Sequence, residues 1–279
     1  MNQSNTSHKK HHSIELPNGG LLCFSRPLVM SIINCTPDSF YPPSRTYSPE
    51  EAADRAVTAE AEGADIVDFG AESSRPGAVP ISEDEEIRRL IPALRLFRRQ
   101  SSLPVSVDTR KAAVARLALD EGADIINDIS SISDEGTITL CAERKAVIVL
   151  MHQGPQNDVR EYLLNQAKKA IQGGIDKGRI ILDPGFGFGK SADDNISLLG
   201  RLATIKHEDY PLLVGLSHKR FIGEITGKEV YLSDNASAQR LSGTIAANVL
   251  AIIGGADIIR VHETAAAVVL VKVIAAVCT

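Results

Sequence analysis

The sequence predicts an α/β fold, a single (β/α)8 TIM barrel preceded by an N-terminal β-hairpin. Short apolar runs alternate eight times with segments of helical period, within a length close to the roughly 250 residues of such a barrel. Nearly every apolar run ends on a residue that can hydrogen-bond or ionise. A Gly-Ala-Asp phrase recurs at residues 63–65, 122–124 and 255–257, where a glycine cap would end a helix and a buried strand would begin. An open, doubly wound sheet is the alternative.

The predicted elements follow in a regular order. Residues 14–24 alternate around Pro17-Asn18-Gly19-Gly20, which predicts a hairpin that could plug the bottom of the barrel. Strands are predicted near residues 28–34, 64–70, 104–108, 124–128, 146–151, 179–183, 211–216 and 256–261. Helices are predicted near residues 49–62, 82–99, 110–121, 134–144, 158–177, 191–204, 234–253 and 264–276. The carboxyl ends of the strands would then share one face, where barrel enzymes carry out their chemistry.

Composition narrows the class of protein. A formal net charge of -5 gives no global attraction to nucleic acid or to anionic lipid, so neither partner is expected. No apolar stretch reaches the ~20 residues of a membrane span. Four scattered cysteines without a Cys-x-x-Cys motif fit a reducing cytoplasm. We expect residues 1–13 to be a disordered tail and residues 14–279 to form one domain.

Polar side chains stand at the ends of the predicted strands. They are Asn34, Asp68, Asp108, Asn127, His152, Asp183, Ser217 with Lys219, and Arg260 with His262. Any one of them is as readily a turn cap or a solvated side chain, but the same pattern at every strand end favours a shared site. Asp108, Asn127 and Asp183 offer hydrogen-bond acceptors to a polar heterocycle, whereas Lys219 and Arg260 suit an anion such as phosphate.

Two loops extend these strand ends. Residues 68–77 carry Ser73, Ser74 and Arg75, and the planar fork of an arginine suits anion recognition. Residues 183–191 are rich in glycine, but Pro184 is incompatible with a Walker A loop and the glycine spacing is not a dinucleotide fingerprint. These glycines would let the backbone approach a flat ligand, with Phe188 covering one edge. Motifs of zinc hydrolases and serine-nucleophile enzymes are absent.

Six ordered segments resemble the bacterial dihydropteroate synthase family of pterin-binding enzymes. They are residues 34–40, 68–77, 106–110 with 123–129, 151–154, 183–190, and 217–223 with 260–262. The resemblance implies a transferase of folate biosynthesis that condenses 6-hydroxymethyl-7,8-dihydropterin diphosphate with p-aminobenzoate, the substrate that sulfonamides imitate. The products would be 7,8-dihydropteroate and diphosphate. The resemblance also implies magnesium as a cofactor and a homodimer, to which the apolar segment 265–277 would contribute.

The same resemblance implies roles for individual residues. The pterin would be held by Asp108, Asn127, Met151, Asp183 and Lys219. The diphosphate would be held by Asn34, Arg75, Arg260 and His262, with Asn34 also a ligand of magnesium. p-Aminobenzoate would be surrounded by Ser73, Ser74, Arg75, Pro76, Phe188 and Ser217. The catalytic residues would be Lys219, Arg260, His262 and Asp108. The implied route is loss of the leaving group to a pterin-stabilised cation followed by attack of the amine, so no enzymic nucleophile is required.

The sequence departs from the usual family pattern at several places. They are Ser31, Ser74, His218, the run Tyr41-Pro42-Pro43-Ser44 in place of Ser-Asp-Gly-Gly, and a shortened His152-Gln153-Gly154. Since the altered run lies in the loop expected to close over the substrates, a catalytically idle pterin-binding homologue is one alternative. A pterin-binding methyltransferase domain of the corrinoid-linked kind is another, but it would not need cations to manage a diphosphate.

Overall fold

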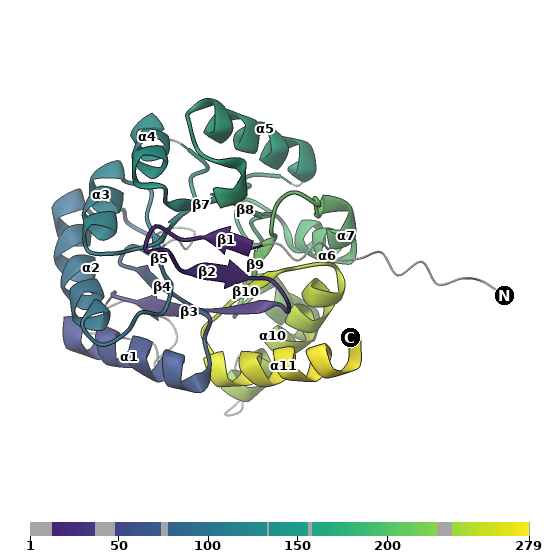
Figure 1. The fold of residues 1–279 in the computed structure, drawn as a ribbon. Helices are drawn as coiled ribbons and strands as arrows, with labels where there is room; N and C mark the ends of the chain where they lie inside the picture. The colour runs from purple at the N-terminus through teal and green to yellow at the C-terminus, as the bar shows by residue number, and fades with distance from the viewer. Residues whose placement is uncertain are drawn as a thin grey trace.

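A computed structural model describes residues 13–36, 48–73, 78–132, 134–155, 158–227 and 236–278. Its centre is a parallel eight-stranded sheet in the order β8-β7-β6-β5-β4-β3-β10-β9, and the helices form a ring around it (Figure 1). The two ends of this order meet, because Leu182 and Leu212 form a parallel bridge and the Leu182 N–H donates to the Pro211 carbonyl at 3.0 Å. The predicted (β/α)8 barrel is therefore confirmed, and the open-sheet alternative is wrong.

The barrel strands all lie within two residues of their predicted bounds. They are β3 (Leu28–Asn34), β4 (Ile66–Gly70), β5 (Val105–Asp108), β6 (Ile125–Asp128), β7 (Val147–Met151), β8 (Ile180–Asp183), β9 (Leu213–Gly215) and β10 (Ile258–Val261). The helices are α1 (Pro49–Glu62), α2 (Glu83–Arg98), α3 (Ala112–Asp120), α4 (Glu135–Arg144), α5 (Val159–Gln172), α6 (Ala192–Gly200), α7 (Leu202–Ile205), α8 (Arg220–Thr226), α10 (Ala236–Ile253) and α11 (Thr264–Cys278). Within the described residues, no helix is both long and apolar enough to cross a membrane.

Three helical segments differ from the prediction. The helix after β7 ends early, at Gln172, because two glycines follow and Gly174 has a φ of 99°. The helix after β8 is divided into α6 and α7 beside Gly200. Helix α8 was not predicted, because its seven residues are too few to display a helical period; it buries Phe221 and Ile222.

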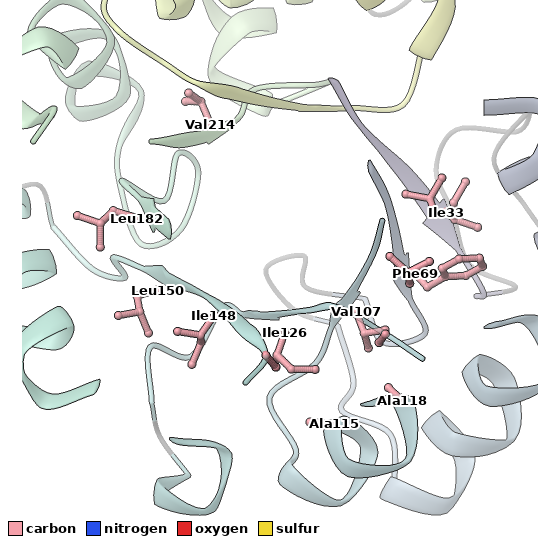
Figure 2. Packing of buried hydrophobic residues seen from close by; sticks show 14 of the residues in the cluster. Ile33, Phe69, Val107, Ala115, Ala118, Ile126, Ile148, Leu150, Leu182 and Val214 are labelled. Carbon is pink, nitrogen blue, oxygen red and sulfur yellow. The ribbon is translucent and has the colours of Figure 1, made fainter. Parts of the chain in front are cut away.

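The alternation of strand side chains separates two apolar clusters. Outward-facing residues pack against the helices, and Figure 2 shows Val107 beside Ala115 and Ala118 of α3. Inward-facing residues fill the barrel; they are Met30, Ile66, Ile125, Val147, Val149, Ile181, Leu213 and Ile258. The hairpin of β1 (Ser13–Glu15) and β2 (Leu21–Cys23), which crosses the barrel in Figure 1, adds Ile14, Leu16 and Leu22 to this second cluster. The hairpin thus plugs the bottom of the barrel, as predicted.

The repeated Gly-Ala-Asp phrase also builds the bottom of the barrel. Its glycines have φ values of 101°, 93° and 98°, which confirms the predicted left-handed caps. Its aspartates have a shared role that was not predicted, since each carboxylate accepts a backbone N–H at the start of the neighbouring strand. The pairs are Asp65 with Val29 (2.8 Å), Asp124 with Val105 (3.0 Å) and Asp257 with Leu212 (2.7 Å). Each carboxylate also forms an ion pair, with Arg26, Arg98 and Lys206 respectively.

Candidate active site

A layer of polar side chains covers the apolar interior at the top of the barrel. Strands β4, β6, β8 and β10 each carry an inward-facing isoleucine and, two residues later, a polar side chain that faces the same way because side chains alternate along a strand. In strand order these polar residues are Asp68, Asn127, Asp183 and Arg260. Asp108 faces the same way at the end of β5, since its neighbour Val107 packs outward. Five of the polar strand ends identified in the sequence thus converge in one place.

Arg260 lies at the centre of this layer between two carboxylates. Its Nε donates to Asp68 Oδ2 at 2.6 Å and its Nη2 donates to Asp108 Oδ2 at 2.8 Å. Burial alone would lower the pKa of Arg260, but the charges of Asp68 and Asp108 outweigh burial and raise it. Burial raises the pKa of Asp108 to about 7, with the Arg260 charge acting against the shift and the Asp68 charge adding to it. The guanidinium is therefore fixed in position before any substrate arrives.

Two buried acceptors in this layer have no hydrogen-bond partner within the described part of the chain. They are Asp68 Oδ1 and Asn127 Oδ1. The Nδ2 of Asn127 donates to the other oxygen of Asp68 at 3.3 Å, which orients both groups. A buried polar atom without a partner costs folding free energy, on the order of 1 to 3 kcal/mol. The pair is consequently prepared for a ligand that brings hydrogen-bond donors into the barrel mouth.

Asp183 lies beside these acceptors at the end of β8. Its Oδ1 accepts the Gly185 N–H at 2.7 Å, so the carboxylate also fixes the start of the glycine-rich loop. Burial raises the pKa of Asp183 to about 6, although the Gly185 N–H and the charge of Lys219 act against the shift. At neutral pH this group is therefore mostly an ionised acceptor.

Lys219 supplies a second cation to the same site, from the residue that precedes α8. Burial, followed by the charge of Arg260, lowers the pKa of Lys219 to about 8, while Asp183 and Asp108 act in the opposite direction. Its Nζ lies 4.3 Å from the centre of the Phe188 ring. Gly187 has a φ of 79°, which favours glycine, and a Cβ there would lie 3.0 Å from the Lys219 Cδ, so the loop passes close to this side chain.

His262 and Ser217 form a separate group at the mouth of the barrel. Ser217 Oγ lies 2.8 Å from His262 Nδ1 and 3.4 Å from a Glu263 carboxylate oxygen. His218 pairs with the other Glu263 oxygen, and the His218 and His262 rings lie 5.4 Å apart. Glu263 thus ties the chain after β9 to the chain after β10.

The structure places the remaining predicted site residues less completely. Met151 is buried at the end of β7 and is the register partner of Asp183. Asn34 and Ser73 are half-buried, at the end of β3 and shortly after β4. The predicted residues Ser74, Arg75 and Pro76 lie outside the described residues, as does the altered run at residues 41–44. The roles assigned from the sequence stay predictions for all of these positions.

Asp68, a strand-end carboxylate for which the sequence predicted no role, accepts hydrogen bonds from both Arg260 and Asn127. The sequence signal for such a role was the position of Asp68 at the end of the apolar run Ile66-Val67. Glu263 and Lys190 were also overlooked, because each acts through contacts with segments distant in sequence. Among the described residues, no three His, Cys, Asp or Glu side chains are grouped so that they could hold a metal ion.

Comparison with known proteins gives consistent matches. The sequence profile of the pterin binding enzyme family matches residues 30–262. Dihydropteroate synthase of Escherichia coli K12 is 40% identical over 272 residues, which cover 92% of this chain and 94% of the relative. The Synechocystis enzyme of the same name is 41% identical over 263 residues, covering 89% of each chain.

Solved structures agree with the sequence matches. The dihydropteroate synthase of Xanthomonas albilineans with 4-aminobenzoic acid is 40% identical, with a TM-score of 0.88, and the match covers 96% of this chain and 99% of that one. The same enzyme in complex with 7,8-dihydropteroate gives a TM-score of 0.85 at 38% identity, with the same coverage. A Yersinia pestis dihydropteroate synthase with a sulfonamide drug gives a TM-score of 0.88 at 34% identity, covering 95% and 99% of the two chains.

Proposed function

The chain belongs to the family of pterin-binding enzymes, and from this premise we propose that it acts as a dihydropteroate synthase. It condenses 6-hydroxymethyl-7,8-dihydropterin diphosphate with p-aminobenzoate. The bond between the methylene carbon and the diphosphate oxygen breaks, with its electron pair leaving on the oxygen. The amine lone pair forms the new C–N bond, and the amine proton passes to solvent. The Xanthomonas albilineans relatives support both sides of this reaction, because one holds 4-aminobenzoic acid and another holds 7,8-dihydropteroate.

The observation that carries this proposal is the layer of buried acceptors at the barrel mouth. A pterin presents a guanidine-like edge of N–H donors, and the ionised Asp183 together with the unpaired oxygens of Asn127 and Asp68 complements such an edge. Met151, buried beside Asp183, would pack on the flat ring. Asp108 completes the acceptor set. A donor-rich heterocycle would thus satisfy groups whose burial otherwise costs stability.

The cations of the site favour departure of the diphosphate. Lys219 is mostly protonated at pH 7, because its lowered pKa of about 8 still lies above that pH. Arg260 is held rigidly by two carboxylates, so little reorganisation is needed as negative charge develops on the leaving oxygen. We assign His262 to the diphosphate as well, since it lies two residues beyond Arg260 on the same face. Arg75, outside the described residues, would complete this set.

Magnesium is proposed as the cofactor. Asn34 can offer one carbonyl oxygen, and Mg²⁺ in enzymes commonly takes one or two protein ligands with the rest from water and substrate phosphates. The residues present fit that pattern. When bound, the ion would neutralise charge on the diphosphate oxygens. The protein's own contribution would be to orient those oxygens through Asn34 and the neighbouring cations.

p-Aminobenzoate would bind on the outer side of the pterin. Phe188, which packs on Lys219, can cover its ring, and Ser217 and Ser73 can donate to its carboxylate. Ser74, Arg75 and Pro76 are assigned to the same subsite. A sulfonamide would compete for these contacts, as the Yersinia pestis relative crystallised with such a drug suggests.

We further propose a homodimer in the cytoplasm, built from the one pterin-binding domain predicted over residues 14–279. Strand β1 begins at Ser13, so the expected tail of residues 1–13 is wrong at its last residue, and residues 1–12 lie outside the described residues. Val269, Val273 and Val277 of α11 are 61%, 58% and 78% exposed and are spaced by four residues, so they share one helix face. Leu250 and Ile253 of the adjoining α10 are exposed too. A second copy of the chain would cover this apolar surface. Free cysteines at residues 23, 35 and 141 are consistent with a reducing compartment.

Two measurements on the purified chain test the function. Isothermal titration with the pterin diphosphate should show binding, and a diphosphate-release assay should then show release that depends on p-aminobenzoate. Binding without release would indicate the catalytically idle alternative. A methyltransferase domain would bind a methylated pterin and release no diphosphate; either of these results contradicts the proposal.

A further inference from the structure

The ammonium group of Lys190 lies within the turn of the glycine-rich loop and faces acceptors from two strand ends. Its Nζ lies 2.9 Å from the Gly185 carbonyl oxygen and 3.0 Å from His152 Nδ1. The carbonyl oxygens of His152 and Phe188 lie at 3.3 Å and 3.4 Å. This set of three carbonyl oxygens and one ring nitrogen, which we call the Lys190 cage, surrounds the cation.

The cage joins the chain that follows β7 to the chain that follows β8. The two segments approach closely: the Gly154 N–H donates to the Phe188 carbonyl at 3.2 Å, and a Cβ on Gly185 would lie 1.9 Å from the His152 carbonyl oxygen. Carbonyl oxygens that converge from two segments repel one another. A positive charge between them removes this repulsion, which explains why a lysine occupies the position.

The His152 ring is suited to accept the Lys190 proton. Burial, followed by the Lys190 charge, lowers the pKa of His152 to about 4, so the ring is neutral near pH 7. A neutral imidazole has one nitrogen free to accept. The ring is held edge-on to Tyr162, with centroids 4.8 Å apart and an interplanar angle of 81°. The fourth acceptor of the cage is therefore as firmly placed as the carbonyl oxygens.

The loop that Lys190 holds carries groups that contact the candidate active site. The Gly185 N–H donates to the Asp183 carboxylate at 2.7 Å, and the Phe188 ring lies against Lys219. Gly187 passes close to the Lys219 side chain, since a Cβ at this position would lie 3.0 Å from the Lys219 Cδ. Displacing the loop would therefore disturb Phe188 and Lys219, whereas Asp183 would lose the Gly185 N–H but keep its own position at the end of β8. Within the described residues, Lys190 itself bonds to the loop and to His152.

We propose that Lys190 is a positioning residue whose ammonium serves as an internal cation for the glycine-rich loop, so that a free ammonium ion can replace it when the side chain is removed. The existence of the cage is independent of the proposed function. Its effect on substrates rests on that function, because Phe188 is assigned to p-aminobenzoate and Asp183 to the pterin.

The test uses Lys190→Ala in the full chain, assayed in ammonium chloride and in sodium chloride of equal ionic strength. In sodium, kcat/KM should fall on the order of 10- to 100-fold, the scale of a misplaced catalytic group. The KM for p-aminobenzoate should rise more than the Kd for the pterin diphosphate, because Asp183 retains its own place at the strand end. Ammonium should restore much of the loss, and it should raise the melting temperature above the value in sodium.

Lys177→Ala is the matched control. The Lys177 ammonium pairs with Asp209 at a half-exposed site and lies 5.8 Å from the centre of the Tyr210 ring, outside any cage of carbonyl oxygens within the described residues. Neither kinetics nor melting should therefore distinguish ammonium from sodium. Lys190→Gln provides a second variant in case Lys190→Ala does not fold, since its amide occupies the cage without charge. It should be impaired and unresponsive to ammonium.

Two outcomes would contradict the proposed role of Lys190. One is a Lys190→Gln enzyme as active as the unmodified chain; the other is a Lys190→Ala enzyme on which ammonium and sodium act alike. If the unmodified chain had no condensing activity at all, the proposed function would fail, yet the difference in melting temperature would still decide whether the cage exists.

Discussion

At the bottom of the barrel, Asp65, Asp124 and Asp257 each accept a backbone N–H and pair with a cation. At the top, Asp68 and Asn127 bury oxygens that have no partner within the described residues. The same parallel strands run from the bottom to the top, and aspartates stand at both ends. The difference lies in what completes the hydrogen bonding: at the bottom the protein itself does so, and at the top the proposed function assigns this role to a ligand.

Burial acts on the aspartates of both ends. It raises the pKa of Asp124, but the Val105 N–H and the Arg98 guanidinium act against the shift and hold the carboxylate in a structural role. It raises the pKa of Asp108 to about 7 and that of Asp183 to about 6, and these groups lie close to Lys219, whose pKa is lowered to about 8. The bottom thus serves stability, whereas under the proposed function the top gives up stability to hold groups ready for substrates.

The largest expected effect is a loss of activity, without a loss of stability, when Lys219 at the top of the barrel is replaced. Lys219→Ala should lower kcat/KM by two to three orders of magnitude, or ~2.7 to 4 kcal/mol, the loss seen when one preorganised donor is removed. The melting temperature of this variant should change little, because the buried Lys219 charge is repelled by the charge of Arg260. Lys219→Arg should rescue poorly, since a planar fork does not replace a compact ammonium. Near-normal diphosphate release by Lys219→Ala would remove the central residue from the proposed mechanism.

The converse effect is expected at the bottom. Asp124→Ala leaves the Val105 N–H and the partly buried Arg98 without their carboxylate, and breaking a buried pair in this way costs about 3 kcal/mol. Urea unfolding followed by circular dichroism measures the loss. The kcat/KM of the folded enzyme should stay within about twofold of its original value, and a large kinetic defect in a fully folded sample would show that the two ends are not separate.

Asp183→Asn tests the acceptor layer. The substitution keeps the shape and an acceptor for the Gly185 N–H but loses the charge, so pterin binding should weaken by ~1.5 to 3 kcal/mol. Isothermal titration with the pterin diphosphate gives this number directly. Unchanged affinity would mean that the pterin is held elsewhere.

The pH profile should report the groups at the top. A carboxyl with a raised pKa keeps its proton to higher pH, so Asp183 and Asp108 become carboxylates only above about pH 6 and 7. Lys219 loses its proton above about pH 8. We expect kcat/KM to be highest between about pH 7 and pH 8. At lower pH it should fall about tenfold per pH unit, and above about pH 8 it should fall again. In Lys219→Arg, the fall in kcat/KM at high pH should be smaller, because an arginine keeps its proton. The remaining fall would come from Lys190, whose pKa is about 8.

The same carboxyl shift predicts a trend in stability. Asp183 binds its proton more tightly in the folded chain than in the unfolded chain, so its contribution to stability is complete below about pH 4 and is lost as the pH rises through 6. Asp183→Asn should remove this pH dependence. Melting curves of both proteins from pH 4 to 8 would show it, and parallel curves would contradict a raised pKa.

The smallest effect concerns the cofactor. Removing magnesium with a chelator should slow diphosphate release, and Asn34→Ala should raise the magnesium concentration for half-maximal rate by a few-fold, since one oxygen ligand of several is lost. Full activity in excess chelator would exclude a role for the ion.

Much of the fold could be predicted because its signals are local. Alternating side chains, glycine caps and the eightfold order of elements are each readable within a short segment, and they fixed the barrel strands to within two residues. The division of α6 from α7 and the short α8 were not predicted, because tertiary packing rather than a sequence period decides such short helices.

The candidate site was predicted in outline but not in its partnerships. The strand-end pattern identified Asp108, Asn127, Asp183 and Arg260 as one group. It did not reveal that Asp68 holds Arg260, because the two residues are 192 positions apart and only barrel closure brings them together. The Lys190 cage was hidden for a similar reason: three of its acceptors are backbone oxygens, which leave no trace in the sequence of side chains.

The most direct test of the contrast between the two ends is a crossed measurement on Asp183→Asn and Asp124→Ala. For each variant, the free energy of unfolding and the Kd for the pterin diphosphate are measured in the same buffer at pH 7. The structure predicts that Asp183→Asn loses pterin affinity without losing stability, and that Asp124→Ala loses stability without losing affinity. If both variants lost the same quantity, the division of the barrel into a stabilising bottom and a substrate-binding top would be contradicted.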